Sequence, residues 1–355
     1  MKNQVNLKLK RLIWLPVIFL LEVFMLAGCK KDSVKIVFTT GFDENAVFMI
    51  EDISCTKPEV MVYLVNTENI YDEVFGDNVW KVPFKEGNVE TQYKESILAR
   101  LAQIKAMNLY ARESGVSLDE KEENLVEAAA EEYFNSLTPQ ELDLLEIDKE
   151  TVEKMYREFA VANKLYASVT ESVNPEISDD EARTVTIRSI LIKTYGIDKD
   201  GNRIEYGADM KDAAMKKAYE IDARIKAGEE FEILAADYNE DEKSAYSFSR
   251  GVMPKAIEDA AFNMSEGEVS GVIQTEYGYH IIKCITNFDE EQTDVNKISI
   301  VEKRKEQTFT EKYDEYISKL TSNLNKELWD SISYERRDGV TTTDFFEIYD
   351  KYFAQ

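Results

Sequence analysis

The stretch Thr275-Glu-Tyr-Gly-Tyr-His-Ile-Ile-Lys283 is the most informative part of this chain, and it contains the only histidine among the 355 residues, His280. The apolar pattern around it predicts two strands, at about 269–275 and 279–285, which close a small domain. A lone histidine on a strand is most often a hydrogen-bonded structural residue. The rest of the sequence therefore has to show whether His280 belongs to a site.

A strand and three helices precede these two strands. Residues 184–192 alternate as a strand, and one of its faces carries Val185, Ile187, Ser189 and Leu191. After a polar insertion at 195–210, apolar residues at helical spacing predict three helices, around 218–225, 231–238 and 257–264. A strand, helices and two more strands within about a hundred residues are typical of a compact α+β domain.

Asp198-Lys-Asp-Gly-Asn202, inside the insertion, weakly matches a calcium-binding loop. It lacks the third acidic position and the closing glutamate of such loops, so a hairpin turn is the favoured interpretation.

Helical sequence flanks this domain on both sides. Residues 89–173 have helical periodicity, with capping boxes predicted at Ser117-Leu-Asp-Glu120 and Thr138-Pro-Gln-Glu141. A further helix is expected near 57–75, and 298–329 is interpreted as one long charged helix. We therefore expect a mainly helical domain over 29–180 and a C-terminal helical segment over 290–355 that packs on it.

The N-terminus predicts export. Four basic residues precede an apolar run that extends from 12 to 27, contains Glu22 and is too short for a comfortable membrane span. The run ends in Leu26-Ala-Gly-Cys29, which resembles a bacterial lipobox. Residues 1–28 are then a signal peptide, and Cys29 is lipidated and anchors the chain to the extracytoplasmic face of the cell membrane. An uncleaved N-terminal anchor is the alternative, and it leaves the body of the protein outside the cytoplasm as well.

Charge and cysteine content exclude several functions. The net charge of −26 disfavours binding to nucleic acid or to an anionic membrane surface. Solubility is the simplest reason for that charge, and attraction of basic clients is the alternative. Cys55 and Cys284 remain after Cys29, and they leave one disulfide open without forming a framework. One histidine and no CxxC motif predict no metal site, and no motif calls for a cofactor.

Several blocks resemble the parvulin family of peptidyl-prolyl isomerases, in the same order and at similar intervals across 184–287. Besides the stretch quoted first, they are Phe231-Glu-Ile-Leu-Ala-Ala-Asp-Tyr238, Phe248-Ser-Arg-Gly-Val-Met253, Glu258-Asp-Ala-Ala-Phe262 and Gly267-Glu-Val-Ser270. The wider layout of signal, helical domain, parvulin domain and returning C-terminal helix is similar to that of the PrsA and SurA foldases.

The resemblance implies roles for four polar residues. His280 matches the second active-site histidine, Thr275 the hydroxyl residue of its network, and Asp241 the Cys or Asp beside the twisting imide. Ser189 departs from the pattern, because it stands where the family usually has its first histidine. Without the resemblance, Asp241 would be a solvated loop residue in an acidic run.

The resemblance also implies a substrate-binding surface. Met253 matches one wall of the prolyl pocket, Phe248 opens the same block, and Ile257 stands where many members have a pocket phenylalanine. The simplest alternative for Met253 and Ile257 is a place in the core.

The implied function is peptidyl-prolyl cis-trans isomerisation that assists exported proteins with X-Pro bonds to fold, without a cofactor. The alternative is a non-catalytic holding chaperone with a degenerate parvulin domain, since Ser189 breaks the paired-histidine network. A solute-binding lipoprotein is disfavoured because no alternating α/β pattern is present. The sequence leaves the oligomeric state open.

Overall fold

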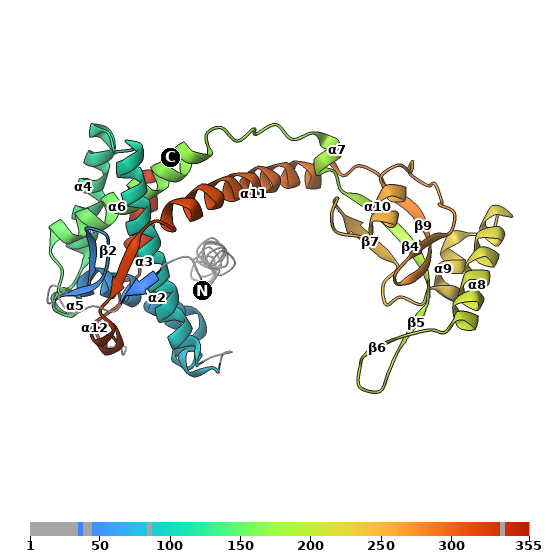
Figure 1. The fold of residues 1–355 in the computed structure, drawn as a ribbon, viewed down its shortest axis with the longest axis horizontal. Helices are drawn as coiled ribbons and strands as arrows, with labels where there is room; N and C mark the ends of the chain where they lie inside the picture. The colour runs from blue at the N-terminus through green and yellow to red at the C-terminus, as the bar shows by residue number, and fades with distance from the viewer. Residues whose placement is uncertain (1–34, 38–44, 84–86, 334–337, 355) are drawn as a thin grey trace, which may run out of the picture. The chain divides into compact units, whose positions relative to one another are not determined.

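The computed structural model describes residues 35–37, 45–83, 87–333 and 338–354. The predicted signal peptide and Cys29 lie outside the described residues. The chain divides into two compact units, which we call the helical unit (1–172 and 306–355) and the mixed unit (173–305) (Figure 1). Within the described residues, no helix combines the length and apolar character needed to cross a membrane.

The helical unit is built from a series of helices that follow local sequence signals. They are α2 (Lys57–Phe75), α3 (Val89–Ser114), α4 (Glu120–Ser136), α5 (Pro139–Leu145), α6 (Lys149–Thr170), α12 (Lys326–Ser331) and α13 (Phe345–Phe353), with a 3-10 turn at Asp77–Lys81. The expected helix near 57–75 is confirmed, and the capping box at Thr138 is present as predicted. The box predicted at Ser117 is wrong by two residues. Asp119 caps α4 instead, because its carboxylate accepts from the Glu122 amide at 2.9 Å and Glu122 reciprocates.

A small sheet in the helical unit corrects the prediction for the C-terminal segment. The expected helix over 298–329 is wrong after residue 317, because α11 (Glu290–Ile317) ends there and Thr321–Leu324 forms strand β10. β10 lies between β1 (Lys35–Val37), to which it is parallel, and β2 (Ala46–Ile50), and β3 (Ile53–Thr56) completes the sheet. Pairing with residues almost three hundred positions earlier in the chain leaves no mark on local periodicity.

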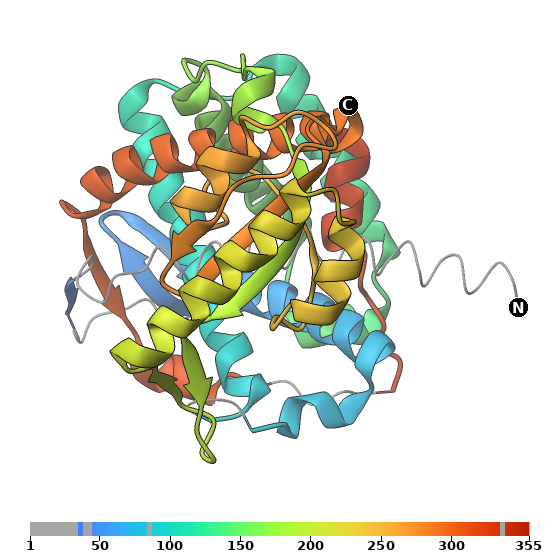
Figure 2. The same cartoon turned by 90° about the vertical axis from the view of Figure 1, so that its right-hand side faces the viewer.

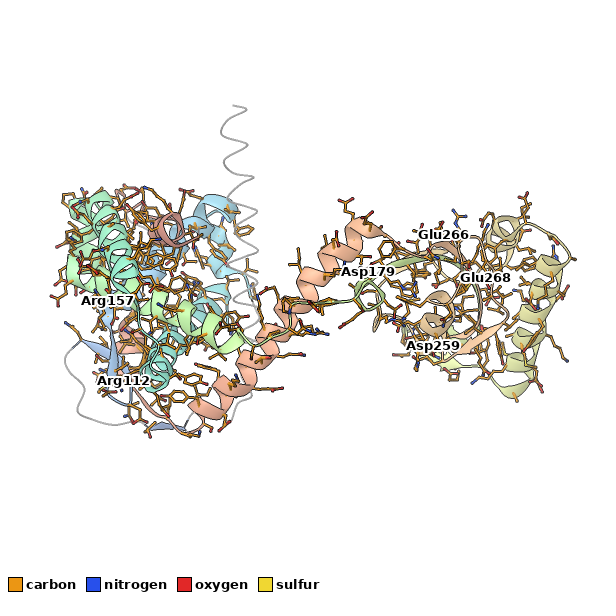
Figure 3. The ribbon with its side chains drawn as sticks, turned by 90° about the horizontal axis from the view of Figure 1, so that it is seen from above. Arg112, Arg157, Asp179, Asp259, Glu266 and Glu268 are labelled. Carbon is orange, nitrogen blue, oxygen red and sulfur yellow. The ribbon has the colours of Figure 1, made fainter. Side chains whose placement is uncertain are left out.

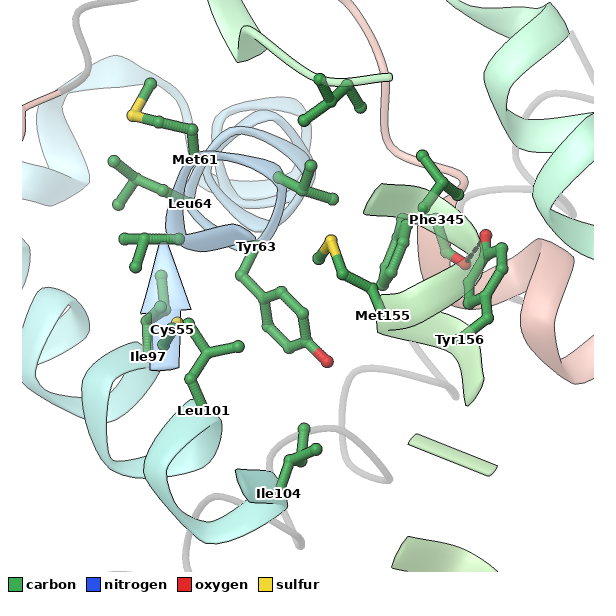
Figure 4. Packing of buried hydrophobic residues seen from close by; sticks show 14 of the residues in the cluster. Cys55, Met61, Tyr63, Leu64, Ile97, Leu101, Ile104, Met155, Tyr156 and Phe345 are labelled. Carbon is green, nitrogen blue, oxygen red and sulfur yellow. Dashed lines mark hydrogen bonds between the residues drawn. The ribbon is translucent and has the colours of Figure 1, made fainter. Parts of the chain in front are cut away.

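The core of the helical unit includes the C-terminal helix. Phe345 of α13 is fully buried, with its ring stacked on Tyr156 of α6 at 4.6 Å and set edge-on to Tyr133 of α4. The Tyr156 hydroxyl donates to the Phe345 carbonyl at 2.7 Å, as Figure 4 shows. On the surface of this unit, Arg112 of α3 pairs with Asp52 and Arg157 of α6 pairs with Glu123 (Figure 3).

The mixed unit contains a four-stranded antiparallel sheet. Its strand order is β7-β4-β9-β8, formed by Ala245–Phe248, Val185–Lys193, Gly278–Thr286 and Ile273–Thr275 respectively. β7 is an element that the sequence pattern did not predict. The strand expected at 269–275 is shorter than predicted, because Val269 makes only an isolated bridge to Lys283.

Helices cover both faces of this sheet. α8 (Ala208–Lys226) and α9 (Phe231–Tyr238) pack on one face, against a cluster that includes Ile190 and Ile281. In Figure 2, α8 crosses in front of the sheet. α10 (Lys255–Ala261) packs on the opposite face.

The second face carries the site. Its core is formed by α10 together with Val185, Ile187, Ile282 and Cys284. His280 lies on the same face of β9 as Ile282 and Cys284, because residues two apart along a strand point to the same side. The insertion folds as a hairpin of β5 (Tyr195–Ile197) and β6 (Arg203–Glu205), which confirms the predicted turn.

Cys55 and Cys284 are both free and buried, Cys55 in the helical unit and Cys284 in the mixed unit. Among the described residues, no group of three or more His, Cys, Asp or Glu side chains is arranged to hold a metal ion.

Candidate active site

Three adjacent strands bring His280, Thr275 and Ser189 together. Thr275 ends β8 at the turn into β9, and its Oγ1 atom lies 2.9 Å from His280 Nε2. Ser189 lies on β4, and its Oγ atom is 3.4 Å from His280 Nδ1. Both ring nitrogens therefore face hydroxyl groups, each of which can donate or accept a hydrogen bond.

His280 is buried and therefore neutral at ordinary pH. Its side chain is only 7% exposed, and burial lowers the pKa of the imidazole from 6.5 to about 4, an effect that the charge of Asp241 partly opposes. A neutral imidazole carries one N–H donor and one acceptor nitrogen. The site thus presents a fixed polar group rather than a cation.

Asp241 follows α9 in a loop that is tied to the sheet. Its Oδ1 atom accepts from the Glu242 amide at 2.8 Å, and its Oδ2 atom accepts from the Tyr246 hydroxyl at 2.6 Å. The Asn239 side chain holds the same loop by accepting from the Leu191 amide of β4 at 3.0 Å. The carboxylate is therefore held in place, and its negative charge raises the pKa of the His280 imidazole.

Tyr246 of β7 is the residue of this site that sequence reasoning missed. Burial and its bond to Asp241 raise the pKa of the Tyr246 phenol well above its ordinary value, so the hydroxyl remains a donor. The sequence contained one indication of this role. Tyr246 and Phe248 lie five and seven residues after Asp241, and their spacing of two is typical of one face of a strand that runs back past the Asp241 loop.

The three expected substrate-binding residues differ in exposure. Phe248 is 4% exposed and Ile257 only 1%, and both belong to the core that α10 forms with the sheet. Met253 is half-buried against the same cluster, and its amide donates to Glu258 Oε1 at 2.9 Å. Met253 therefore keeps part of its apolar side chain exposed, whereas Phe248 and Ile257 are enclosed in the core.

Comparison with known proteins shows which families this chain resembles. The family model of the PPIC-type PPIASE domain matches residues 190–286. The chain is 26% identical over 315 residues to the foldase protein PrsA of Caldanaerobacter subterraneus subsp. tengcongensis, which covers 86% of this chain and 92% of that protein. It is 41% identical over 83 residues to foldase protein PrsA of Geobacillus sp. (strain WCH70), which covers 22% of this chain and 30% of the relative.

One solved structure is similar to this chain at lower sequence identity. The crystal structure of the peptidylprolyl isomerase PrsA from Bacillus cereus is 16% identical, with a TM-score of 0.34 and coverage of 90% of this chain and 99% of that chain.

The mixed unit is therefore a parvulin-type peptidyl-prolyl isomerase domain, within the α+β fold class that the sequence predicted. Over most of its length the chain is similar to foldase proteins of the PrsA type.

Proposed function

We propose that this chain accelerates cis-trans isomerisation of X-Pro bonds in exported polypeptides, at a site made by His280, Thr275, Asp241 and Met253. The observation that carries the proposal is the buried, neutral His280 imidazole between two hydroxyls in a PPIC-type domain. Rotation about the X-Pro bond breaks amide resonance, with a barrier of about 18–20 kcal/mol. No other covalent bond has to form or break.

Each side chain then has a role in stabilising the twisted imide. Met253 contacts the proline ring and excludes water, which strengthens polar interactions around the bond. His280 and Thr275 supply oriented dipoles that need no reorganisation as the carbonyl turns. Asp241 acts as a fixed negative charge, since a carboxylate that already accepts two hydrogen bonds is poorly suited to attack the substrate.

Ser189 replaces an imidazole with a hydroxyl in this arrangement. The Ser189 hydroxyl reaches His280 Nδ1, although at 3.4 Å the contact is long. We propose that this contact is sufficient to hold the imidazole, so that the domain is active rather than a degenerate holding module.

A peptide assay tests the proposal. The chain from residue 30 onward is incubated with short X-Pro peptides, and the cis-to-trans rate is followed as kcat/KM. We expect His280→Ala and Met253→Ala to lower kcat/KM by about tenfold or more, a loss of about 1.4 kcal/mol in transition-state stabilisation. The matched control is Met210→Ala, because Met210 lies exposed on α8 of the same unit. A rate at background, together with suppression of client aggregation, would establish the holding-chaperone alternative instead.

Ser189→His tests the role of the hydroxyl. We expect less than a tenfold gain, because Ser189 is buried and an imidazole has to displace packed neighbours. A larger gain would show that the native site is impaired.

We also propose that signal peptidase removes residues 1–28 and that Cys29 carries lipid, which anchors the chain outside the cytoplasm. The strongly acidic chain has little intrinsic attraction to anionic lipid, so retention depends on the anchor. Cys29→Ser should move the protein from the membrane fraction to the soluble fraction. Unchanged retention would identify the N-terminal segment as an uncleaved anchor.

The helical unit is proposed to hold client segments. Aggregation of an unfolded client, measured with and without the chain carrying His280→Ala, separates this holding role from catalysis.

A further inference from the structure

The β5–β6 hairpin is in direct contact with the turn that carries Thr275. The turn covers residues 275–278 and joins β8 to β9. Arg203 of β6 donates from Nη2 to the carbonyl oxygen of Glu276, in the middle of this turn. A residue from the polar insertion thus binds the backbone next to the active-site hydroxyl.

Arg203 is itself held in a defined orientation. Its guanidinium lies 4.3 Å from the ring centroid of Tyr195, on the facing strand of the hairpin, and 5.3 Å from that of Tyr277, in the turn. Glu205 accepts from Arg203 Nε at 2.9 Å and so fixes the remaining edge of the guanidinium. A planar group between two rings, with a carboxylate at its edge, has little freedom to rotate.

The turn passes this constraint on to the imidazole. The Tyr277 amide donates to Thr275 Oγ1 at 3.1 Å, and Thr275 Oγ1 lies 2.9 Å from His280 Nε2. Arg203 therefore contacts both residues of one peptide bond, the Glu276 carbonyl and the Tyr277 ring. The N–H of that same peptide bond donates to the Thr275 hydroxyl.

Thr194, which directly follows β4, makes hydrogen bonds to both the turn and the base of the hairpin. The Thr194 amide donates to the Tyr277 carbonyl at 3.2 Å, and the Thr194 carbonyl accepts from the Tyr206 amide at 2.9 Å. Gly278 fits closely against β4, since a Cβ atom there would lie 2.1 Å from the Ile192 carbonyl oxygen. The far end of the turn is thus fixed by the sheet, while Arg203 fixes its middle.

We propose that Arg203 is a positioning residue for the isomerase site, which acts through the 275–278 turn to hold Thr275 against His280. This inference rests on the proposed function for its rate measurement, but its spectroscopic measurement does not depend on catalysis.

The variant Arg203→Gln tests the proposal, and Lys211→Gln is the matched control. Lys211 pairs with the same carboxylate, Glu205, at 2.9 Å, so both changes remove one positive charge from one cluster. Of these two cations, Arg203 is the one that binds the turn. Arg203→Lys keeps the charge but loses the planar, forked donor.

The sole histidine makes a direct measurement possible in the full mature chain. With labelled histidine, the NMR signal of the imidazole reports on His280 alone. We expect both Arg203 variants to shift this signal and to lower kcat by about five- to tenfold with KM changed less than about twofold. Lys211→Gln should leave the imidazole signal and both constants at the values of the unsubstituted protein.

An unshifted imidazole signal in both Arg203 variants would overturn the proposal, whatever the rates are. The same holds if Lys211→Gln produces an equal shift, because the effect then comes from charge alone. If the unsubstituted chain shows no isomerase rate, the proposed function fails, and the imidazole shift still decides whether Arg203 positions Thr275 and His280.

Discussion

The depressed pKa of His280 leads to a measurable prediction about rate and stability. Burial lowers the pKa from 6.5 to about 4, so the imidazole should remain neutral from pH 5.5 to 8. The imidazole NMR signal should titrate near pH 4, and kcat/KM should not follow a histidine ionisation above pH 5.5. The protein has to be produced without a histidine tag, since the native chain contributes a single imidazole.

The same shift makes the mixed unit less stable in acid. In the unfolded chain the imidazole binds a proton below about pH 6.5, whereas in the folded unit it does so only near pH 4. The unfolded state therefore holds more protons between these values, and stability falls as the pH falls through this window. The loss attributable to His280 is about 2 kcal/mol at pH 5 and approaches about 3 kcal/mol below pH 4.

His280→Gln is the control, because carboxylates also titrate in acid. The difference between the two stability curves isolates the histidine, and it should be flat above pH 7 and sloped between pH 6.5 and 4. Unfolding has to be followed by amide signals of the mixed unit, because every tryptophan lies outside residues 173–305. A measured pKa near 6.5, or a kcat/KM that rises sigmoidally between pH 6 and 7, would refute the argument that His280 acts as a buried neutral group.

Further predictions concern the helical unit and the thiols. Lys105 is 0% exposed between two carboxylates, so Lys105→Met should cost about 3–5 kcal/mol in urea unfolding followed by tryptophan fluorescence. A cost below about 1 kcal/mol would show that the ion pairs are solvated in solution. Phe345→Ala should cost about 3–5 kcal/mol in the same assay, whereas Phe75→Ala, at a side chain 58% exposed, should cost less than about 0.5 kcal/mol. Burial raises the pKa of Cys55 and Cys284, so both should resist a thiol reagent until urea unfolds the protein, and rapid labelling of either would contradict their burial.

Local signals made much of the fold predictable. The helix at Lys57–Phe75 begins after Thr56 with Pro58 in its first turn and Glu59 completing a capping box, and these signals act within four residues. The helix at Phe231–Tyr238 follows from a single apolar face.

What could not be predicted depends on pairing across long stretches of chain. β10 is a strand because β1 and β2 offer it partners on both sides, and nothing in the composition of Thr321–Leu324 requires this. The contacts of Tyr246 with Asp241 and of Arg203 with the 275–278 turn likewise arise only once the sheet and its hairpin have formed.

Ser189 bears on activity through both its residue type and its position beside His280. The sequence shows that an expected imidazole is missing, which favours a weakened site. The structure shows that His280 is neutral and that its Nδ1 atom faces the Ser189 hydroxyl, with Nε2 bound to Thr275. A neutral imidazole needs one partner for its N–H and one for its lone pair, and two hydroxyls can meet both needs. The missing ring therefore removes bulk and a second titrating group from the site, while each ring nitrogen of His280 still faces a hydroxyl, Ser189 at 3.4 Å and Thr275 at 2.9 Å.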